Sequence, residues 1–224
     1  MCYNEVMKLL LTKRQEEILV GSILGDGCVY PIAVSAAKSK NCCYYFKQSW
    51  ENKDYVFWLY QELKSICPSE PKQRKDNKQW YFYSYFSRDL VPWRRKFYPR
   101  DKKVVPQDIA VILTSSLSIA IWYMDDGTLD YRPNYHCSFS LSTHSFSLKD
   151  TWKLVDVLGR NFGIKASVSN NLIRGTRYPR IYIGKEGRDR FVQLISPHIL
   201  DCFKYKLPQY RQPLRDFSRI KIGG

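Results

Sequence analysis

The sequence predicts an α+β fold made of two similar halves, and two observations support this prediction. An apolar run of helical length ends at Asp26, and a second such run ends at Asp126, 100 positions later; a glycine follows each aspartate. After each run the chain shows the same order of patterns: two strands, a helix, two strands and a helix. We therefore expect an N-terminal half over residues 1–98, a linker over 99–108 and a C-terminal half over 109–224.

In the first half, a capping box defines the start of the first helix. Thr12 and Gln15 have the spacing of a capping box, in which each side chain accepts a hydrogen bond from the backbone N–H of the other residue. The helix is expected to run to about Gly25. The later elements follow from apolar spacing and from runs rich in Val, Tyr and Phe, and they are expected at 28–36 (strand), 42–50 (strand), 52–66 (helix), 70–75 (strand), 80–86 (strand) and 87–98 (helix).

The second half repeats this order after its own helix, which ends at Asp126. Its expected elements are strands at 128–136 and 137–143, a helix at 147–162 that stops at Gly163, strands at 165–172 and 179–184, and a helix at 187–195. A basic tail over 204–221 closes the chain.

Composition points to a polyanionic partner. Lys and Arg number 36 against 21 Asp and Glu, so the net charge is +15, which is typical of a nucleic-acid-binding protein and, less so, of one that binds an anionic membrane surface. The longest apolar stretch, 109–124, is interrupted by Thr and Ser and is shorter than the roughly 20 residues that a membrane span requires. No strongly basic amphipathic helix is found, so we expect no membrane partner.

The cysteines indicate a reducing compartment. There are seven, an odd number, and no pair is separated by two residues. The N-terminal pattern is not that of a signal peptide. We expect an intracellular protein of an organelle (chloroplast or mitochondrion) or of a prokaryotic cytoplasm.

The aspartates at the two helix ends are unusual. A helix C-terminus carries partial negative charge, so a carboxylate there costs about 0.3–1 kcal/mol. The same unfavourable placement at Asp26 and Asp126 suggests that a cation compensates both.

The two motifs, residues 19–27 and 119–127, resemble those of the monomeric, two-motif LAGLIDADG homing endonucleases. The first copy keeps Gly21 and Gly25 four residues apart on one helix face, whereas the second has Ile121 and Asp125 at these positions. The resemblance implies two pseudo-symmetric αββαββα halves, each with a saddle-shaped antiparallel sheet that lies over DNA, packed through the motif helices. It also implies that the protein is a monomer.

The resemblance implies a metal site at the motif ends. It assigns Asp26 and Asp126 as metal ligands, with the backbone carbonyls of Gly25 and Asp125 facing the metals. Mg²⁺ suits a site of one or two carboxylates completed by water and substrate oxygens, and Mn²⁺ is expected to substitute. The three histidines and the scattered cysteines show no zinc spacing.

Three further residues match the catalytic positions of the family. Lys103 and Lys206 lie 77 and 80 positions after the aspartates of their halves, where a cation near the scissile phosphate could stabilise charge or activate water. Each could instead contact the DNA backbone or lie in a loop. Gln48 resembles the residue that positions water, and its counterpart in the second half is either Ser142 or Thr143.

Basic residues on and around the expected strands are the candidates for DNA contact, since Arg and Lys pair with guanine edges in the major groove. They are Lys38, Lys40, Lys72, Arg74, Arg132, Arg174, Arg177, Arg180 and Lys185.

The resemblance implies a site-specific endonuclease that hydrolyses both strands of a long, asymmetric DNA target and leaves short 3′ overhangs. Two alternatives stay open. Proteins of this family also act as RNA maturases on intron RNA, and related modules bind DNA without cutting it.

Overall fold

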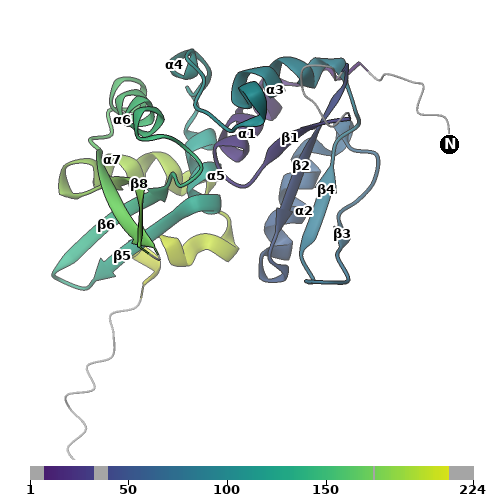
Figure 1. The fold of residues 1–224 in the computed structure, drawn as a ribbon. Coiled ribbons are helices and arrows are strands. Elements are labelled where there is room, and N and C mark those ends of the chain that lie inside the picture. Colours follow the sequence, from purple (N-terminus) through teal and green to yellow (C-terminus); the bar gives the residue numbers. More distant parts are fainter. Residues whose placement is uncertain (1–7, 33–39, 174, 212–224) are drawn as a thin grey trace, which may run out of the picture.

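The computed structural model describes residues 8–32, 40–173 and 175–211, which form two similar halves side by side (Figure 1). The first half consists of α1 (Lys13–Leu24), β1 (Cys28–Pro31), β2 (Cys42–Gln48), α2 (Lys53–Leu63), β3 (Lys72–Gln73), β4 (Trp80–Tyr83) and α3 (Val91–Phe97). The predicted capping box is confirmed, since Thr12 Oγ1 accepts from the Gln15 N–H and the Gln15 side chain accepts from the Thr12 N–H.

The second half repeats the order after a short additional helix, α4 (Ile109–Ile112). Its elements are α5 (Ser116–Asp126), β5 (Gly127–Arg132), β6 (His136–Ser142), α6 (Leu148–Phe162), β7 (Ser167–Ile173), β8 (Thr176–Ile183) and α7 (Lys185–Ile195). Gly163 ends α6 in the left-handed conformation (φ 68°), as expected for a glycine stop.

Each half contains one antiparallel sheet of four strands. The strand orders are β1-β2-β4-β3 and β5-β6-β8-β7, so the two sheets have the same topology. Alternate side chains of each sheet are buried under helices, for example Phe46 and Phe82 in the first sheet and Leu141 and Ile181 in the second. The α+β fold class with two pseudo-symmetric halves is therefore confirmed.

The two motif helices, α1 and α5, run parallel at the centre of the molecule. Ser118 Oγ donates to the Glu17 carbonyl oxygen at 2.6 Å near the start of the contact. Farther along, Gly21 lies against Ser118 and Ile121, and Gly25 lies against Asp125. The residue numbers of the contacting pairs increase together along both helices, so the helices are parallel. Their two C-terminal ends therefore meet at one place.

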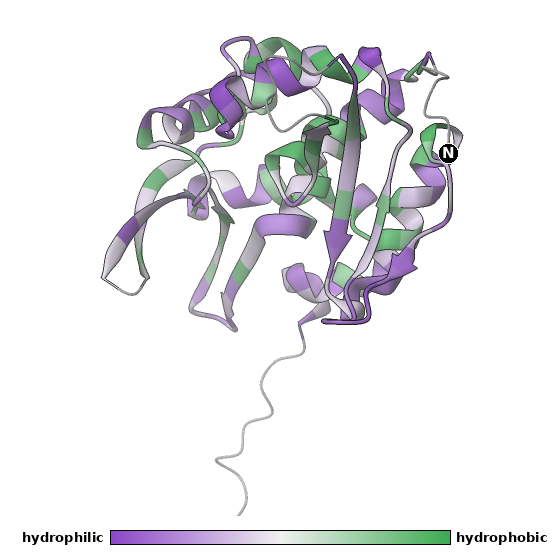
Figure 2. Ribbon diagram, turned by 45° about the vertical axis from the view of Figure 1, so that its right-hand side comes forward, coloured by the Kyte–Doolittle hydropathy of each residue, from purple (hydrophilic) through white to green (hydrophobic). Residues whose placement is uncertain are grey.

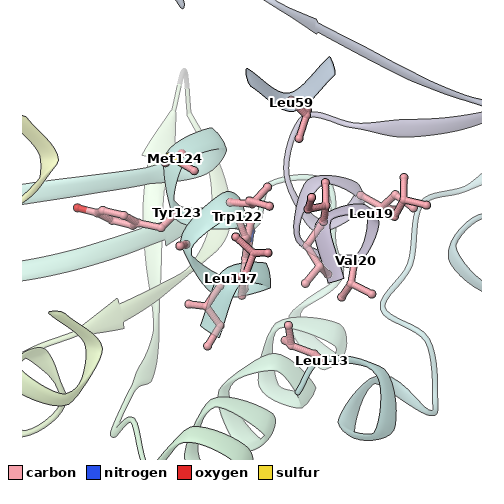
Figure 3. Close-up of a cluster of buried hydrophobic side chains, with 14 of the residues drawn as sticks. Leu19, Val20, Leu59, Leu113, Leu117, Trp122, Tyr123 and Met124 are labelled. Atoms are coloured by element: carbon pink, nitrogen blue, oxygen red, sulfur yellow. The ribbon is translucent and has the colours of Figure 1, made fainter. Parts of the chain in front are cut away.

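A continuous core surrounds this helix pair (Figures 2 and 3). Figure 3 shows Leu19 and Val20 on α1 and Leu117 and Trp122 on the neighbouring α5, and all four side chains are buried. Figure 2 shows the most hydrophobic segments at the centre, between the two sheets. Because both motif helices are buried on nearly every side, their position is determined by packing from both halves.

Several strands are shorter than the sequence pattern predicts. β3 contains only Lys72 and Gln73, and β5 stops at Arg132 because residues 133–135 form a turn in which Asn134 has a φ of 65°. The helix α4 was not predicted separately. The division into 1–98, 99–108 and 109–224 stays a prediction.

Substitution of Gly21 by Ala tests the close contact of the helices. The new Cβ would lie 2.3 Å from the Ser118 carbonyl oxygen and 2.9 Å from Ser118 Cα. Both are backbone atoms, so the helices must separate, and we expect the free energy of unfolding to fall by about 1–3 kcal/mol in urea titrations. Gly159→Ala on α6 is the control. Nothing lies within 4 Å of its new methyl group, so about 0.5–1 kcal/mol of added stability is expected. Equal effects of the two substitutions would contradict the steric argument.

Candidate active site and nucleic-acid interface

Asp26 and Asp126 lie at the adjoining C-terminal ends of α1 and α5. The parallel packing of the helices brings them together, and the charge of Asp26 raises the pKa of Asp126. Burial is the larger cause, and together with this repulsion it raises the Asp126 pKa to about 7. Burial also raises the pKa of Asp26, although the Lys103 charge opposes this shift. The site therefore brings together carboxyl groups with raised pKa values, although Asp26 is itself exposed.

Asp125 adds a third carboxylate, at the position where the first motif has Gly25. Its Oδ1 accepts from the Tyr55 hydroxyl at 2.8 Å, and its Oδ2 accepts from the Asp26 N–H at 3.2 Å. A Cβ on residue 25 would lie 2.4 Å from this Oδ2, so only glycine fits there. Burial, then the charge of Asp26, holds the pKa of Asp125 well above its usual range. A side chain of the second motif is thus held by groups of the first half.

Lys103 and Lys206 cap the ends of the two motif helices. Lys103 Nζ donates to the Gly25 carbonyl oxygen at 2.7 Å, and Lys206 Nζ donates to the Met124 carbonyl oxygen at 2.7 Å. Burial lowers the pKa of both ammonium groups, and the nearby aspartates oppose this shift. Cations at helix C-termini offset the partial negative charge there. The two lysines predicted from spacing therefore lie within the same charge cluster as the aspartates.

Gln48 reaches the first aspartate. It lies at the end of β2, and its Nε2 donates to Asp26 Oδ2, while its Oε1 accepts from Asn52 Nδ2 at 3.2 Å. Sheet pairing identifies its counterpart. Cys28 and Thr128 each lie two residues after the aspartate of their motif, and they pair with Tyr45 in the first sheet and Ser140 in the second. Tyr45 therefore corresponds to Ser140, and Gln48, three residues later, corresponds to Thr143. Ser142 lies on the opposite face of its strand.

The aspartates are a suitable donor set for Mg²⁺. Asp26 and Asp126 offer hard carboxylate oxygens. Within the described residues, no three His, Cys, Asp or Glu side chains are grouped so that they could enclose a metal alone. Mg²⁺ suits such a partial site because water and phosphate oxygens complete its shell. The Gly25 carbonyl oxygen already accepts from Lys103, so one lone pair remains for a metal.

The open face of the first sheet is aromatic and basic. Tyr45, Lys47 and Tyr81 share it, since Lys47 pairs with Tyr81, and Lys72 pairs with Tyr81 from β3. Lys47 and Lys72 are exposed. Arg74 extends this face from just beyond β3, and its Nη2 lies 2.7 Å from Asp76 Oδ2. Lys40 is exposed just before β2, whereas Lys38 lies outside the described residues.

The open face of the second sheet is more polar. Arg180 pairs with Ser142 and donates to Ser169 Oγ at 3.0 Å, and Arg132 shares the corresponding face of β5 with Asp130. The strand register places Arg177 on the face of the sheet that the helices cover. Lys185 is the first residue of α7, which packs on that same face. The structure therefore does not bring Arg177 and Lys185 to the face that Arg180 shares. Arg174 lies outside the described residues.

Three features of the site were missed from the sequence. Lys47 alternates with buried aromatic residues on β2, and this alternation could have identified it as a residue of the open face. Asp125 was assigned only through its backbone carbonyl, and Tyr55 was not assigned to the site. No sequence signal indicates that their side chains meet, because they come from different halves.

Two antiparallel sheets joined through parallel helices, each ending at an aspartate, define the two-motif LAGLIDADG endonuclease class. The chain belongs to this class by sequence as well, since the model of the LAGLIDADG DNA endonuclease family matches residues 16–191.

Three individual proteins are similar to this chain in sequence or structure. DNA endonuclease I-ChuI of Chlamydomonas applanata is 27% identical over 88% of this chain and 95% of its own. The structure of the homing endonuclease I-WcaI bound to its DNA recognition sequence superposes with a TM-score of 0.75 at 26% identity, covering 89% of this chain and 88% of the other. Cytochrome b mRNA maturase bI2 of Saccharomyces cerevisiae is 28% identical over 86% of this chain, which spans 47% of that protein.

In the part of the chain that the structure describes, no helix has the length and apolar character needed to cross a membrane.

Asp126→Asn is expected to stabilise the protein in the absence of metal. Asp126 ionises with a pKa of about 7 in the folded state and about 3.9 in the unfolded chain. Its charge therefore destabilises the folded state fully above pH ~7, and the penalty disappears as the pH falls towards ~4. In EDTA, the substitution should raise the free energy of unfolding by about 1–3 kcal/mol near pH ~8 and much less near pH ~5. The exposed Asp189→Asn is the control, and a gain that does not depend on pH would contradict the prediction.

Proposed function

We propose that this protein is a site-specific endonuclease that cuts both strands of DNA with divalent metal ions held by Asp26 and Asp126. The observation that carries the proposal is the parallel packing of α1 and α5, which places one carboxylate of each motif at a single point between two open sheet faces. Two adjacent carboxylate sites suit two phosphodiester bonds, one on each strand.

The chain's own residues have distinct roles in this proposal. The basic and aromatic open faces hold the duplex through phosphates and base edges, with Lys47, Lys72, Arg74, Arg132 and Arg180 on these faces. Asp26 and Asp126 would hold the divalent ions, which would supply a nucleophilic water and stabilise the leaving oxygen. Lys103 and Lys206 hold positive charge at the site, and Gln48 fixes the orientation of the Asp26 carboxylate.

Relatives support the proposal. The similar structure is that of a homing endonuclease bound to its DNA recognition sequence, and the similar Chlamydomonas protein is named a DNA endonuclease. We propose Mg²⁺ as the ion, with Mn²⁺ as a substitute, because the site offers oxygen ligands. Both motifs belong to one chain, so we propose that a monomer acts.

We also propose that the protein works in a reducing compartment, in an organelle or a prokaryotic cytoplasm. Among the described residues, Cys28, Cys43, Cys67, Cys137 and Cys202 are free thiols, which agrees with such a compartment.

One relative favours a second candidate function. The Saccharomyces cerevisiae protein that matches over 86% of this chain is named an mRNA maturase. An RNA partner would suit the same net charge of +15, but it would not require both aspartates.

The endonuclease proposal is tested by selecting cleaved duplexes from a randomised DNA library with Mg²⁺. We expect one long, partly asymmetric site cut on both strands with short 3′ overhangs. Asp26→Asn and Asp126→Asn should each abolish double-strand cleavage, because each removes a ligand charge, and EDTA should do the same. Ca²⁺ is included to measure binding without cleavage. Duplexes that bind and are never cut would contradict the proposal, and intron RNA would then be the ligand to test.

Lys47→Ala tests the open face. Loss of a phosphate contact should weaken binding to the selected duplex in Ca²⁺ and reduce the slope of log K against log salt by about one. Lys165→Ala is the matched control, since Lys165 is exposed and pairs at 2.9 Å with Glu186 of α7, the helix that packs on the covered side of the second sheet. Equal weakening by both substitutions would mean that binding depends on net charge and not on this face.

A further inference from the structure

The loop that carries Lys103 is held by one arginine of the first half. Residues 102–106 form neither helix nor strand, yet Lys103 Nζ donates to the Gly25 carbonyl oxygen at 2.7 Å. Arg94 of α3 is buried, and its Nη2 donates to Asp101 Oδ1 at 2.6 Å. The guanidinium therefore ties the chain to α3 two residues before Lys103.

The same guanidinium also holds the strand that follows the first motif. Arg94 Nη1 donates to the Val29 carbonyl oxygen at 2.9 Å, and Val29 lies on β1 three residues after Asp26. One side chain thus bridges the segment that leaves Asp26 and the segment that leads to Lys103. Because the guanidinium is planar and its donors have fixed directions, the bridge sets the spacing of the two segments.

The backbone is strained at this bridge. Arg100 and Asp101 have φ angles of 55° and 61°, in the left-handed region that residues other than glycine rarely adopt. Such strain persists only where surrounding contacts impose it, and it is concentrated at functional sites. The ion pair of the Asp101 carboxylate is a contact of this kind. Directly after Lys103, the Val104 N–H donates to the Phe97 carbonyl oxygen at 2.8 Å, so the lysine is held from both sides.

The lysine of the second half is held in a different way. Lys206 is the last residue of a 3₁₀ helix, Asp201–Lys206, and its backbone carbonyl oxygen accepts from the Tyr123 hydroxyl of α5 at 2.8 Å. Helical structure and a direct bond to the motif helix therefore hold this lysine. Lys103 lies in an irregular loop, so its position depends on the bridge that Arg94 makes.

We propose that Arg94 and Asp101 are positioning residues for the cleavage reaction, and that they act by holding Lys103 at the end of the first motif helix. The inference rests on the endonuclease function proposed above, in which Lys103 holds positive charge at the site. A displacement of about 1 Å at a reacting group can cost about a hundredfold in rate. Loss of one contact that holds the loop is a smaller defect, so we expect a loss of about tenfold.

The experiment is a double-mutant cycle of Asp101 and Lys103, measured as the single-turnover rate at which excess enzyme cleaves the selected duplex in Mg²⁺. Asp101→Asn removes the charge of the ion pair, and asparagine tolerates the left-handed conformation. It should lower the rate about tenfold, and Lys103→Met should lower it about a hundredfold. Because Asp101 acts through Lys103, Asp101→Asn should change the rate by less than about twofold in the Lys103→Met background.

Asp108→Asn is the matched control. Asp108 follows the same loop and pairs with Lys96 of α3 at 2.5 Å, but it lies five residues after Lys103, and its side chain makes no capping hydrogen bond to α4. The rate should stay as in the wild type. Arg94→Lys keeps the charge and loses the planar fork, so it should slow cleavage as Asp101→Asn does. Binding of these three variants to the duplex in Ca²⁺ should stay unchanged.

Three results would overturn the inference alone. They are an unchanged rate for Asp101→Asn, the same loss of rate from Asp101→Asn with and without Lys103→Met, and a Lys103→Met protein that cuts as fast as the wild type. Equal slowing by Asp108→Asn and Asp101→Asn would also overturn it, since any ion pair to α3 would then have the same effect. Failure of the wild-type protein to cut any duplex would overturn the endonuclease function and this inference together.

Discussion

The close contact between α1 and α5 is the constraint on which the rest of the structure depends. Gly21 lets the backbone of one helix touch Ser118 of the other, and the Ser118 hydroxyl bonds the Glu17 carbonyl oxygen at 2.6 Å. Two parallel helices at this distance must bring their C-terminal ends, and so Asp26 and Asp126, to one place. The sheets then extend to either side of this centre, with their uncovered faces available to a duplex.

This arrangement makes the site electrostatically unfavourable without ligand. Three carboxylates gather at two helix ends that already carry partial negative charge, and burial is the largest cause of every raised carboxyl pKa among them. Lys103 and Lys206 compensate in part by bonding helix-end carbonyl oxygens. The carboxylates that would attract cations are therefore the groups whose charge lowers the stability of the folded protein, a trade-off that is common at active sites.

Much of the fold was predictable because local and periodic signals agree with it. The capping box at Thr12, the glycine stop at Gly163 and the repeated Asp-Gly endings each reflect short-range chemistry that the sequence carries directly. The aspartates and lysines followed from their repeated spacing together with the resemblance to the family. The packing of the motif helices was expected, but individual side-chain contacts between the halves were not predictable: the bond from Tyr55 to Asp125 joins residues 70 positions apart, and no periodicity encodes such a pair. The counterpart of Gln48 could be chosen between two neighbours only through strand register.

The contact of Gly25 with Asp125 has a consequence for the history and engineering of this chain. The Asp125 carboxylate occupies the space that a side chain on residue 25 would need, and the Tyr55 hydroxyl of the first half completes its hydrogen bonds. A homodimer of two second halves would force two such carboxylates into that space. A homodimer of two first halves would leave a buried tyrosine hydroxyl without an acceptor on each side. The two halves, although they share one topology, have become obligate complements that can no longer be exchanged for each other.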